Sequence, residues 1–353
     1  MCDLKKSVII GMSGGVDSTV GAYLLKQQGY KVTGVTLKML REQNGFAQIE
    51  ADAKKAADML GIEHITLDFT KSFEDIVVAD FINEYKAGRT PNPCIVCNRF
   101  LKFEKLLEAA DKLGADYIAT GHYAKIDFNA ETGRYFVRKS VYDRKDQSYV
   151  LYRLTQEQLK RTVMPLFKYS KDEIRAIAEK IGLEAANKPD SQDICFIPDG
   201  DYIGFLKSRS CTSPQGDFVD AGGNKIGTHL GIMHYTIGQR KGLGMTFGKP
   251  MFVSRINAEN NTVELCEAGG QYKNTVFAEN VNFQPFERLD VPQTFMCKLR
   301  YSAKPQEALV TPIGEGRVKI EFEDCKSAAA PGQAAVFYSG DMLVGGGIIY
   351  DMY

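Results

Sequence analysis

The sequence of 353 residues has no excess charge of either sign and no long hydrophobic run. It carries 44 lysines and arginines against 44 aspartates and glutamates, so any contact with nucleic acid would use local patches and not global charge. No segment approaches the roughly 18 to 20 consecutive apolar residues that cross a bilayer. The chain also enters a strand-like segment at residues 7–12 without a cleavage region before it. We therefore expect a soluble, cytoplasmic protein with no membrane partner.

Cysteine is sparse as well. The eight cysteines are spread over the whole chain, at positions 2, 94, 97, 195, 211, 266, 297 and 325. This spacing excludes the dense disulfide framework of small secreted domains, and in a reducing compartment such thiols are core residues, metal ligands or catalysts. Hydrophobic residues make up 44% of the chain, which excludes disorder as the main state and is enough for a large core in two or three domains.

The first half of the chain alternates between short apolar segments and amphipathic ones. Strands are expected at residues 7–12, 31–39, 64–69 and 116–120. Helices are expected at residues 18–28, 49–60, 73–87 and 99–113. Ser170 and Glu173 form a capping-box pattern that starts a further helix ending near Lys180. Strands separated by helices predict an α/β fold with a doubly wound parallel sheet.

From about Gly200 the pattern changes, because glycine and proline become frequent and helical periodicity disappears. Short alternating runs predict β-strands of small barrels or sheets. They lie at residues 249–256, 261–268, 294–301, 307–313, 317–322 and 334–340. A second break at Gly269 and Gly270 divides this half. We therefore expect three domains, at residues 1–200, 201–270 and 271–353.

The segment SGGVDS, Ser13 to Ser18, lies between a predicted strand and a predicted helix. Small residues let backbone N–H groups close around phosphate oxygens, and the helix N-terminus adds its dipole. The segment lacks the ending of a Walker loop and the GxGxxG of a dinucleotide fold. It resembles instead the pyrophosphate-binding loop of the ATP pyrophosphatase superfamily, in which Asp17 would help hold Mg²⁺ on the leaving pyrophosphate. The alternative is an ordinary glycine-rich turn.

Two further segments contain cysteines in suggestive settings. Cys94 and Cys97 stand in PNPCIVCN, which is either half of a structural zinc site or the setting of a reactive thiolate at Cys97. No second CxxC or HxxxH completes a zinc site, and a helix beginning at Arg99 would lower the pKa of the Cys97 thiol. Cys195 lies in PDSQDICFIPDGDY, where the alternative is a buried core cysteine.

The order of seven blocks resembles that of tRNA-specific 2-thiouridylases of the MnmA type, over nearly the whole chain. The blocks are SGGVDS, the segment at Met39, GRTPNPCIVCNRFLKF, ATGHYAKI, RKDQSYVLYRL, PDSQDICFI and HYTIGQRKGLG. The resemblance implies an adenylation domain with an adenine nucleotide alpha-hydrolase-like fold. It further implies a small central domain and a C-terminal β-barrel that helps hold tRNA.

The same resemblance implies a reaction in which ATP adenylates the 2-oxygen of the wobble uridine and sulfur then replaces that oxygen. Cys195 would receive a persulfide from a donor, a cysteine desulfurase or a sulfur relay protein, and Cys97 would be the second catalytic thiol. Either the persulfide attacks carbon 2 directly, or Cys97 first liberates hydrosulfide as the attacker. Both routes end in a disulfide between Cys97 and Cys195 that must be reduced.

The resemblance also implies binding residues for ATP with Mg²⁺ and for tRNA. The ATP residues would be Gly11, Met12, Ser13, Gly14, Gly15, Val16, Asp17, Ser18, Met39 and Gly121. The tRNA residues would be Asn92, Pro93, Cys94, His122, Lys145, Asp146, Gln147, Arg300, Tyr301 and Gln333. The alternative for Met39 and His122 is a place in the core. A solvated face or barrel surface is the alternative for Lys145, Asp146, Gln147, Arg300, Tyr301 and Gln333.

One position departs from the pattern of this family, in which an aspartate stands three residues before the first catalytic cysteine. Here that position is Cys94, so no acid or base role can be carried over. Cys94, Cys97 and Cys195 could instead hold three irons of a [4Fe–4S] cluster. A synthetase or ligase that shares only the phosphate loop, and a zinc-bearing RNA-binding module without turnover, are also compatible with these residues.

Overall fold

The computed structural model describes residues 6–40, 46–183 and 194–353. Cys2 and residues 189–193 of the PDSQDICFI block lie outside the described residues. Among the described residues, no helix is both long and apolar enough to span a membrane.

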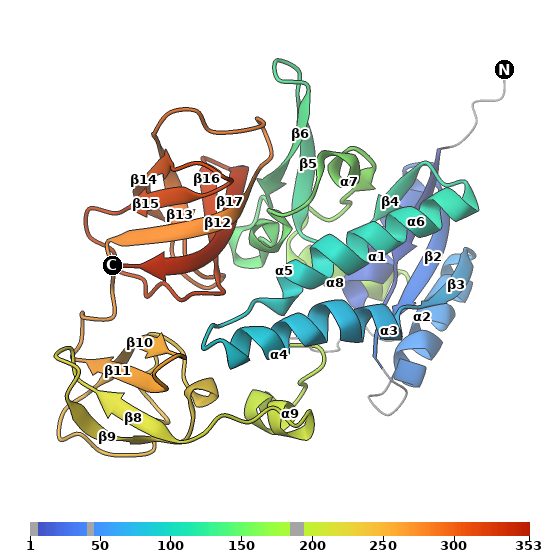
Figure 1. The fold of residues 1–353 in the computed structure, drawn as a ribbon. Coiled ribbons are helices and arrows are strands. Elements are labelled where there is room, and N and C mark those ends of the chain that lie inside the picture. Colours follow the sequence, from blue (N-terminus) through green and yellow to red (C-terminus); the bar gives the residue numbers. More distant parts are fainter. Residues whose placement is uncertain (1–5, 41–45, 184–193) are drawn as a thin grey trace.

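The first half of the chain forms a five-stranded sheet in the order β3-β2-β1-β4-β7 (Figure 1). Its strands are β1 (Ser7–Gly11), β2 (Lys31–Lys38), β3 (Glu63–Asp68), β4 (Tyr117–Ala119) and β7 (Thr162–Val163). All neighbouring strands run parallel. The doubly wound parallel sheet predicted from the alternation of strands and helices is therefore confirmed.

Side chains of β1 alternate between the two faces of this sheet because successive residues of a strand point to opposite sides. Val8 and Ile10 pack with helices on one face, and Ile9 packs with α6 (Phe103–Leu113) on the other. The helices of the first face are α1 (Val16–Gln27), α2 (Phe46–Leu60) and α8 (Lys171–Lys180). Helix α8 begins at the predicted capping box, in which Ser170 and Glu173 each accept a hydrogen bond from the other's backbone N–H. The predicted capping box and the predicted end of the helix near Lys180 are both confirmed.

Two longer helical runs contain π-helical turns. One consists of α3 (Thr70–Phe73), η2 (Glu74–Val78) and α4 (Ala79–Lys86), and the other of α5 (Pro93–Cys97), η3 (Asn98–Lys102) and α6. The second run begins six residues before the predicted start at Arg99, so that start was wrong. Pro93 suits the first helical position, because its fixed φ is helical and its missing N–H is not needed there. Cys97 therefore lies inside a helical run and not before one.

The last part of the chain is a barrel in which β17 pairs back onto β12. Its strands, in sheet order, are β12 (Thr275–Phe283), β15 (Val318–Glu321), β14 (Gln306–Pro312), β13 (Gln293–Lys298), β16 (Ala334–Ser339) and β17 (Met342–Met352). The predicted C-terminal β-barrel is thus confirmed. A hairpin of the first half, β5 (Ala124–Asn129) and β6 (Arg134–Lys139), extends the barrel sheet beside β17. Between β6 and β7 the chain forms η4 (Asp143–Lys145), η5 (Ser148–Leu151) and α7 (Gln156–Lys160).

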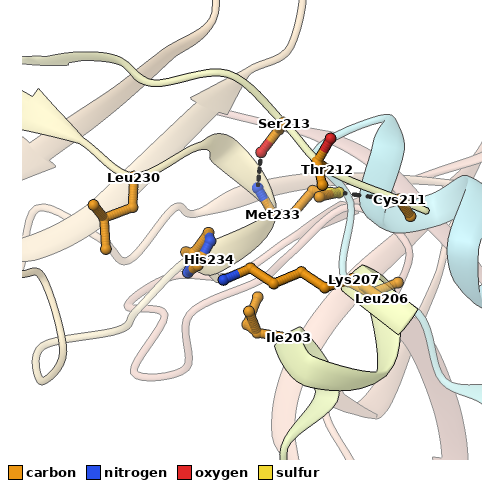
Figure 2. Close-up of a pocket in the computed structure, with 9 residues that line it drawn as sticks. All are labelled: Ile203, Leu206, Lys207, Cys211, Thr212, Ser213, Leu230, Met233 and His234. Atoms are coloured by element: carbon orange, nitrogen blue, oxygen red, sulfur yellow. Dashed lines mark hydrogen bonds between the residues drawn. The ribbon is translucent and has the colours of Figure 1, made fainter. Parts of the chain in front are cut away.

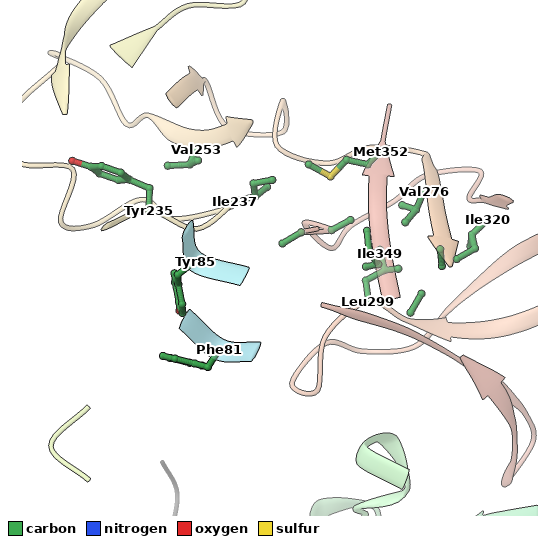
Figure 3. Packing of buried hydrophobic residues seen from close by; sticks show 14 of the residues in the cluster. Phe81, Tyr85, Tyr235, Ile237, Val253, Val276, Leu299, Ile320, Ile349 and Met352 are labelled. Atoms are coloured by element: carbon green, nitrogen blue, oxygen red, sulfur yellow. The ribbon is translucent and has the colours of Figure 1, made fainter. Parts of the chain in front are cut away.

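The middle part holds a small sheet in the order β10-β11-β8-β9. Its elements are β8 (Gly216–Val219), β9 (Lys225–His229), η7 (Ile232–His234), β10 (Phe252–Asn257) and β11 (Thr262–Cys266), preceded by α9 (Tyr202–Ser208), which was not predicted. The core that surrounds Phe81 and Tyr85 of α4 extends to Tyr235 of the middle part and Ile349 of the barrel (Figure 3). All three parts of the chain therefore share one apolar core.

Candidate active site

The predicted phosphate loop joins the end of β1 to the start of α1. Ser18 closes it, because its hydroxyl accepts from the Ser13 N–H at 3.3 Å and donates to the Gly15 carbonyl at 3.2 Å. Gly14 has a φ of +69°, and a Cβ there would lie 2.4 Å from the Cβ of Asp52 on α2. Only glycine fits both constraints, so the loop is drawn tightly against α2.

Asp17, in the first turn of α1, is held by two side chains distant in sequence. The Lys171 ammonium at the start of α8 donates to both carboxylate oxygens, at 2.8 and 2.9 Å. The Tyr123 hydroxyl donates to the same carboxylate at 2.6 Å. Gly121 lies against this turn, since a Cβ there would be 3.1 Å from the Ser18 nitrogen. The predicted loop residues and Gly121 are thus brought together at the carboxyl edge of the sheet.

Met12 and Met39 link this edge to the thiols. Met12 is buried, its N–H donates to the Val35 carbonyl at 2.8 Å, and its carbonyl accepts from the Thr36 hydroxyl at 2.9 Å. The Met39 sulfur lies 3.9 Å from the sulfur of Cys97. The carboxyl end of β2 therefore reaches from the phosphate-loop side of the sheet to the helical run that holds Cys97.

Cys94, Cys97 and Cys195 gather around one lysine, Lys102. Cys97 is buried, whereas Cys94 and Cys195 are exposed to solvent. Burial raises the pKa of Cys97 to about 12; the Lys102 charge opposes this shift, and Cys195 and Cys94 add to it. Cys195 presents surface to solvent, but the protein around its thiol partly desolvates the sulfur and so raises the pKa of Cys195, again against the Lys102 charge. The lowered Cys97 pKa expected from a helix N-terminus is thus wrong, because Cys97 ends α5 inside a continuous run and is cut off from water.

His122 also lies within the electrostatic reach of Lys102. Its Nδ1 is 2.8 Å from the Thr120 hydroxyl oxygen, and its ring stacks obliquely on Phe103, with ring centroids 5.8 Å apart. Burial and, to a smaller extent, the Lys102 charge together lower the pKa of His122 to about 3. The imidazole is therefore neutral at physiological pH.

The chain segment before Cys94 is fixed by the barrel. The Gln333 amide donates to the carbonyls of Thr90 and Pro91, at 3.0 Å each. The Thr90 N–H in turn donates to the Pro331 carbonyl at 2.8 Å. Asn92 and Pro93 follow directly as the cap and first residue of α5. Gln333 thus positions predicted tRNA residues through backbone contacts.

The remaining predicted tRNA residues form a second group. Gln147 accepts from the Tyr123 N–H at 3.0 Å, and Asp146 accepts from the Ser140 N–H at 3.0 Å and the Ser148 hydroxyl at 2.7 Å. The exposed Tyr301 donates its hydroxyl to the Asp146 carbonyl at 3.1 Å.

Arg300 differs from its neighbour Tyr301. Its guanidinium donates to the carbonyls of Ala328 at 2.9 Å and Ile237 at 2.6 Å, and so joins the barrel to the middle part. Lys145 ends η4, directly before Asp146 in the chain. In this structure the side chains of Arg300, Asp146 and Gln147 form hydrogen bonds with backbone groups. The ring of Tyr301 is exposed to solvent.

A separate cavity of about 260 Å³ lies between α9, residues 211–213 and the segment that contains η7 (Figure 2). Lys207, Cys211, Met233 and His234 are among its lining residues, and the Lys207 side chain extends toward the His234 ring. None of the lining residues belongs to the predicted site. The cavity is therefore distinct from the gathering of thiols.

Comparison with known proteins places this geometry in a family. Residues 6–199 match the family described as tRNA methyl transferase HUP domain, residues 203–267 its PRC-barrel domain, and residues 273–349 the aminomethyltransferase beta-barrel domain. The chain is 49% identical over 355 residues to a tRNA-specific 2-thiouridylase MnmA of Clostridioides difficile (strain 630), covering 98% of both chains. The chain belongs to the MnmA family. A member from Acetivibrio thermocellus is 47% identical and covers 98% of this chain and 99% of its own length.

Solved structures show weaker likeness to this MnmA family member. The NMN synthetase from Francisella tularensis has a TM-score of 0.34 at 18% identity, over 53% of this chain and 67% of its own. A 4-thiouridine synthetase in complex with RNA and bound ATP has a TM-score of 0.36 at 17% identity, over 58% of this chain and 50% of its own.

The residues do not form a ready metal site. Among the residues that the structure describes, no group of three or more His, Cys, Asp or Glu side chains could hold a metal ion. Cys94, Cys97 and Cys195 thus lie near one another without the ligand arrangement of a zinc ion or a [4Fe–4S] cluster. The Asp17 carboxylate, expected on Mg²⁺, is engaged by Lys171 and Tyr123.

Three residues of this MnmA site were missed from the sequence: Lys171, Tyr123 and Lys102. Lys171 could have been noticed in the sequence, because a lysine in the first turn of a helix is unfavourable next to the positive end of the helix dipole. Its presence there indicates a nearby negative partner. Tyr123 and Lys102 stand inside blocks quoted for the resemblance, but only the fold brings them to Asp17 and to the thiols.

Proposed function

We propose that the protein catalyses the ATP-dependent 2-thiolation of the wobble uridine of tRNA. Its full-length relatives are named tRNA-specific 2-thiouridylases and cover 98% of the chain, which outweighs the mention of methyl transfer in the descriptions of the family domains. The observation that carries the proposal is the 3.9 Å contact between the sulfurs of Met39 and Cys97. It joins the nucleotide edge of the sheet to a buried thiol, as a reaction that couples adenylation to sulfur transfer requires.

In the first step the phosphate loop, residues 13–18, would bind the phosphates of ATP through backbone N–H groups and the start of α1. The uracil 2-oxygen attacks the α-phosphorus, pyrophosphate leaves, and the base becomes an adenylate whose carbon 2 is electrophilic. This activation is needed because an unmodified carbonyl oxygen is a poor leaving group. Mg²⁺, when bound, would neutralise the pyrophosphate, and Asp17 could contribute to it once its pairing with Lys171 opens.

In the second step a persulfide on Cys195 would supply sulfur. If its terminal sulfur attacks carbon 2, AMP leaves with the oxygen and the base is joined to Cys195 through a disulfide. The Cys97 thiolate then attacks the Cys195 sulfur, which releases the 2-thiouridine and forms the Cys97–Cys195 disulfide. If Cys97 attacks first, hydrosulfide leaves and itself displaces AMP. Either route consumes two electrons from an external thiol reductant.

The exposure of the two thiols suits these roles. Cys195 is exposed, as a thiol must be to receive sulfur from a donor protein, such as a cysteine desulfurase or a relay protein. Cys97 is buried, as a thiol must be to act only on a neighbour. We assign adenylation to residues 1–200, and we assign tRNA contacts to residues 271–353 together with the segment Asn92 to Cys94. Residues 201–270 form the small domain between them.

The test is nucleoside mass spectrometry of tRNA after incubation with the protein, ATP, Mg²⁺ and a persulfide donor. We expect 2-thiouridine at the wobble position, with one pyrophosphate and one AMP released per thiolated base. Omission of ATP should abolish the product. Pyrophosphate release without thiolation in the complete mixture would instead indicate a ligase that shares only the phosphate loop.

A further inference from the structure

Lys102 differs from the two basic residues nearest to it in its helical run, Arg99 and Lys105. Arg99 pairs with Glu104 at 2.8 Å, and Lys105 pairs with Glu108 at 2.6 Å. Lys102 has no carboxylate partner among the residues that the structure describes. Its charge acts instead on the three sulfurs of Cys97, Cys94 and Cys195 and on the neighbouring His122.

The π-helical turn η3 brings Lys102 to the side of Cys97. In an α-helix a residue five positions further on points about 140° away, because each residue turns the chain by about 100°. In η3 the Phe103 N–H donates to the Asn98 carbonyl five residues earlier, so one turn takes more residues. Cys97 and Lys102 therefore come to lie close to one another on successive turns. Single π-helical turns of this kind are frequent at functional sites.

Lys102 is the positive charge of this site. Burial by itself would lower the pKa of Lys102, but the neighbouring Cys97, Cys94 and Cys195 raise it above its ordinary value. The ammonium therefore remains charged at neutral pH. The nearby His122 is neutral in the same range because its pKa is about 3.

We propose that the Lys102 ammonium is the counterion of the thiolates of Cys97 and Cys195 and stabilises the sulfur anions through which transfer passes. A buried thiol such as Cys97 is a poor nucleophile until it loses its proton, and a nearby cation favours the anion. The role rests on the proposed function in that Cys97 and Cys195 are taken as the thiols that carry and release sulfur. Lys102 is thus a positioning residue that acts through the thiols.

The test compares Lys102→Met, which removes the charge at similar length, with Lys102→Arg, which keeps it. Lys105→Met is the matched control, because Lys105 lies on the same helical run but pairs with Glu108. The first measurement is the rate of Cys195 alkylation by iodoacetamide against pH in the full-length protein, read by peptide mass spectrometry. We expect Lys102→Met to move this profile to higher pH and to slow alkylation about tenfold at neutral pH, equivalent to about one pKa unit. Lys102→Arg and Lys105→Met should follow the wild type.

The second measurement is single-turnover thiolation from persulfide-loaded protein, again against pH. Lys102→Met should lower the thiolation rate without changing tRNA-dependent release of pyrophosphate. Lys102→Gln gives the same comparison with a polar side chain if the methionine variant does not fold. Cys195 profiles that coincide in the wild type and in the folded charge-removing variant would overturn the proposal. Wild-type protein that makes no 2-thiouridine, while its Cys195 profile still depends on Lys102, would overturn the proposed function alone.

Discussion

The Lys171 ammonium, buried at the start of α8, donates hydrogen bonds to both oxygens of the Asp17 carboxylate in the first turn of α1. Two helix N-termini and a lysine therefore meet around one carboxylate. Each of these N-termini is the positive end of a helix dipole, so Asp17 neutralises a strongly positive region. This region lies directly beside the loop proposed to bind the phosphates of ATP.

Asp17→Ala should abolish pyrophosphate release and also destabilise the fold. The change leaves the Lys171 ammonium buried without the Asp17 carboxylate, which costs on the order of 1–3 kcal/mol because Asp17 itself is partly open to solvent. Urea unfolding and a pyrophosphate assay measure the two effects. The double variant Asp17→Ala/Lys171→Met should be more stable than Asp17→Ala, since it also removes the buried positive charge. Near-normal pyrophosphate release by Asp17→Ala would contradict the placement of ATP at this loop.

The His122 ring should stay neutral over the physiological range. Burial lowers its pKa to about 3 from an ordinary value of 6.5, so its contribution to stability is complete above about pH 6.5. That contribution is lost as the pH falls toward 3, because the unfolded chain then takes up a proton that the folded site resists. Histidine NMR signals can be assigned by single substitutions, since the chain has only four histidines. A His122 titration midpoint near 6.5 would show that the ring is not buried beside Lys102.

Gln333→Ala should weaken tRNA use without affecting ATP. It removes two hydrogen bonds to the carbonyls of Thr90 and Pro91, together about 1–3 kcal/mol, and so loosens the segment that leads into Asn92 and α5. We expect the KM for tRNA to rise several-fold while the KM for ATP is unchanged. The exposed barrel residue Gln293 provides the control variant Gln293→Ala. An equal rise of both KM values would indicate general destabilisation instead.

Cys94→Asp introduces the aspartate that the resemblance described under Sequence analysis leads us to expect at this position, and it should keep a substantial part of the thiolation activity. Cys94 is exposed, so the carboxylate is tolerated, and it would share the charge of Lys102 with the thiols. Cys97→Ser and Cys195→Ser should form no 2-thiouridine, because a hydroxyl cannot carry or release sulfur, while pyrophosphate release continues. Product per enzyme and the iron content of anaerobically prepared protein are the measurements. About four irons per chain, with activity that vanishes in Cys94→Asp, would support a cluster mechanism in place of the persulfide one.

Local patterns predicted the parts of the fold that local interactions determine. The loop between β1 and α1, the capping box at Ser170 and four barrel strands (β13 to β16) could be predicted, because each depends on neighbours within a few residues. The strands β12 and β17, which pair to close the barrel, were not predicted. The start of α5 was misplaced because Pro93 was taken as part of a loop, whereas proline is also a good first residue of a helix.

Contacts between distant residues could not be predicted in the same way. Asp17 and Lys171 are 154 positions apart, and no periodicity in either segment refers to the other. The position of Lys102 among the thiols depends on a π-helical turn, which has no sequence signature as distinct as a cap or a turn. The expectation of a lowered Cys97 pKa failed for the same reason. It considered only the neighbouring helix, whereas burial in the assembled core raises the pKa.

The β5–β6 hairpin and the segment after it pack against a barrel that is synthesised after them. Tyr149 and Tyr152 are buried against Val336 and Tyr338, and the Tyr149 hydroxyl donates to the Ala334 carbonyl at 2.8 Å. While the chain is still emerging from the ribosome, these tyrosines have no partner surface to cover them. The packing of this segment must therefore follow synthesis of the barrel strands, and a nascent chain halted near residue 270 should be readily cleaved by protease and retained by chaperones.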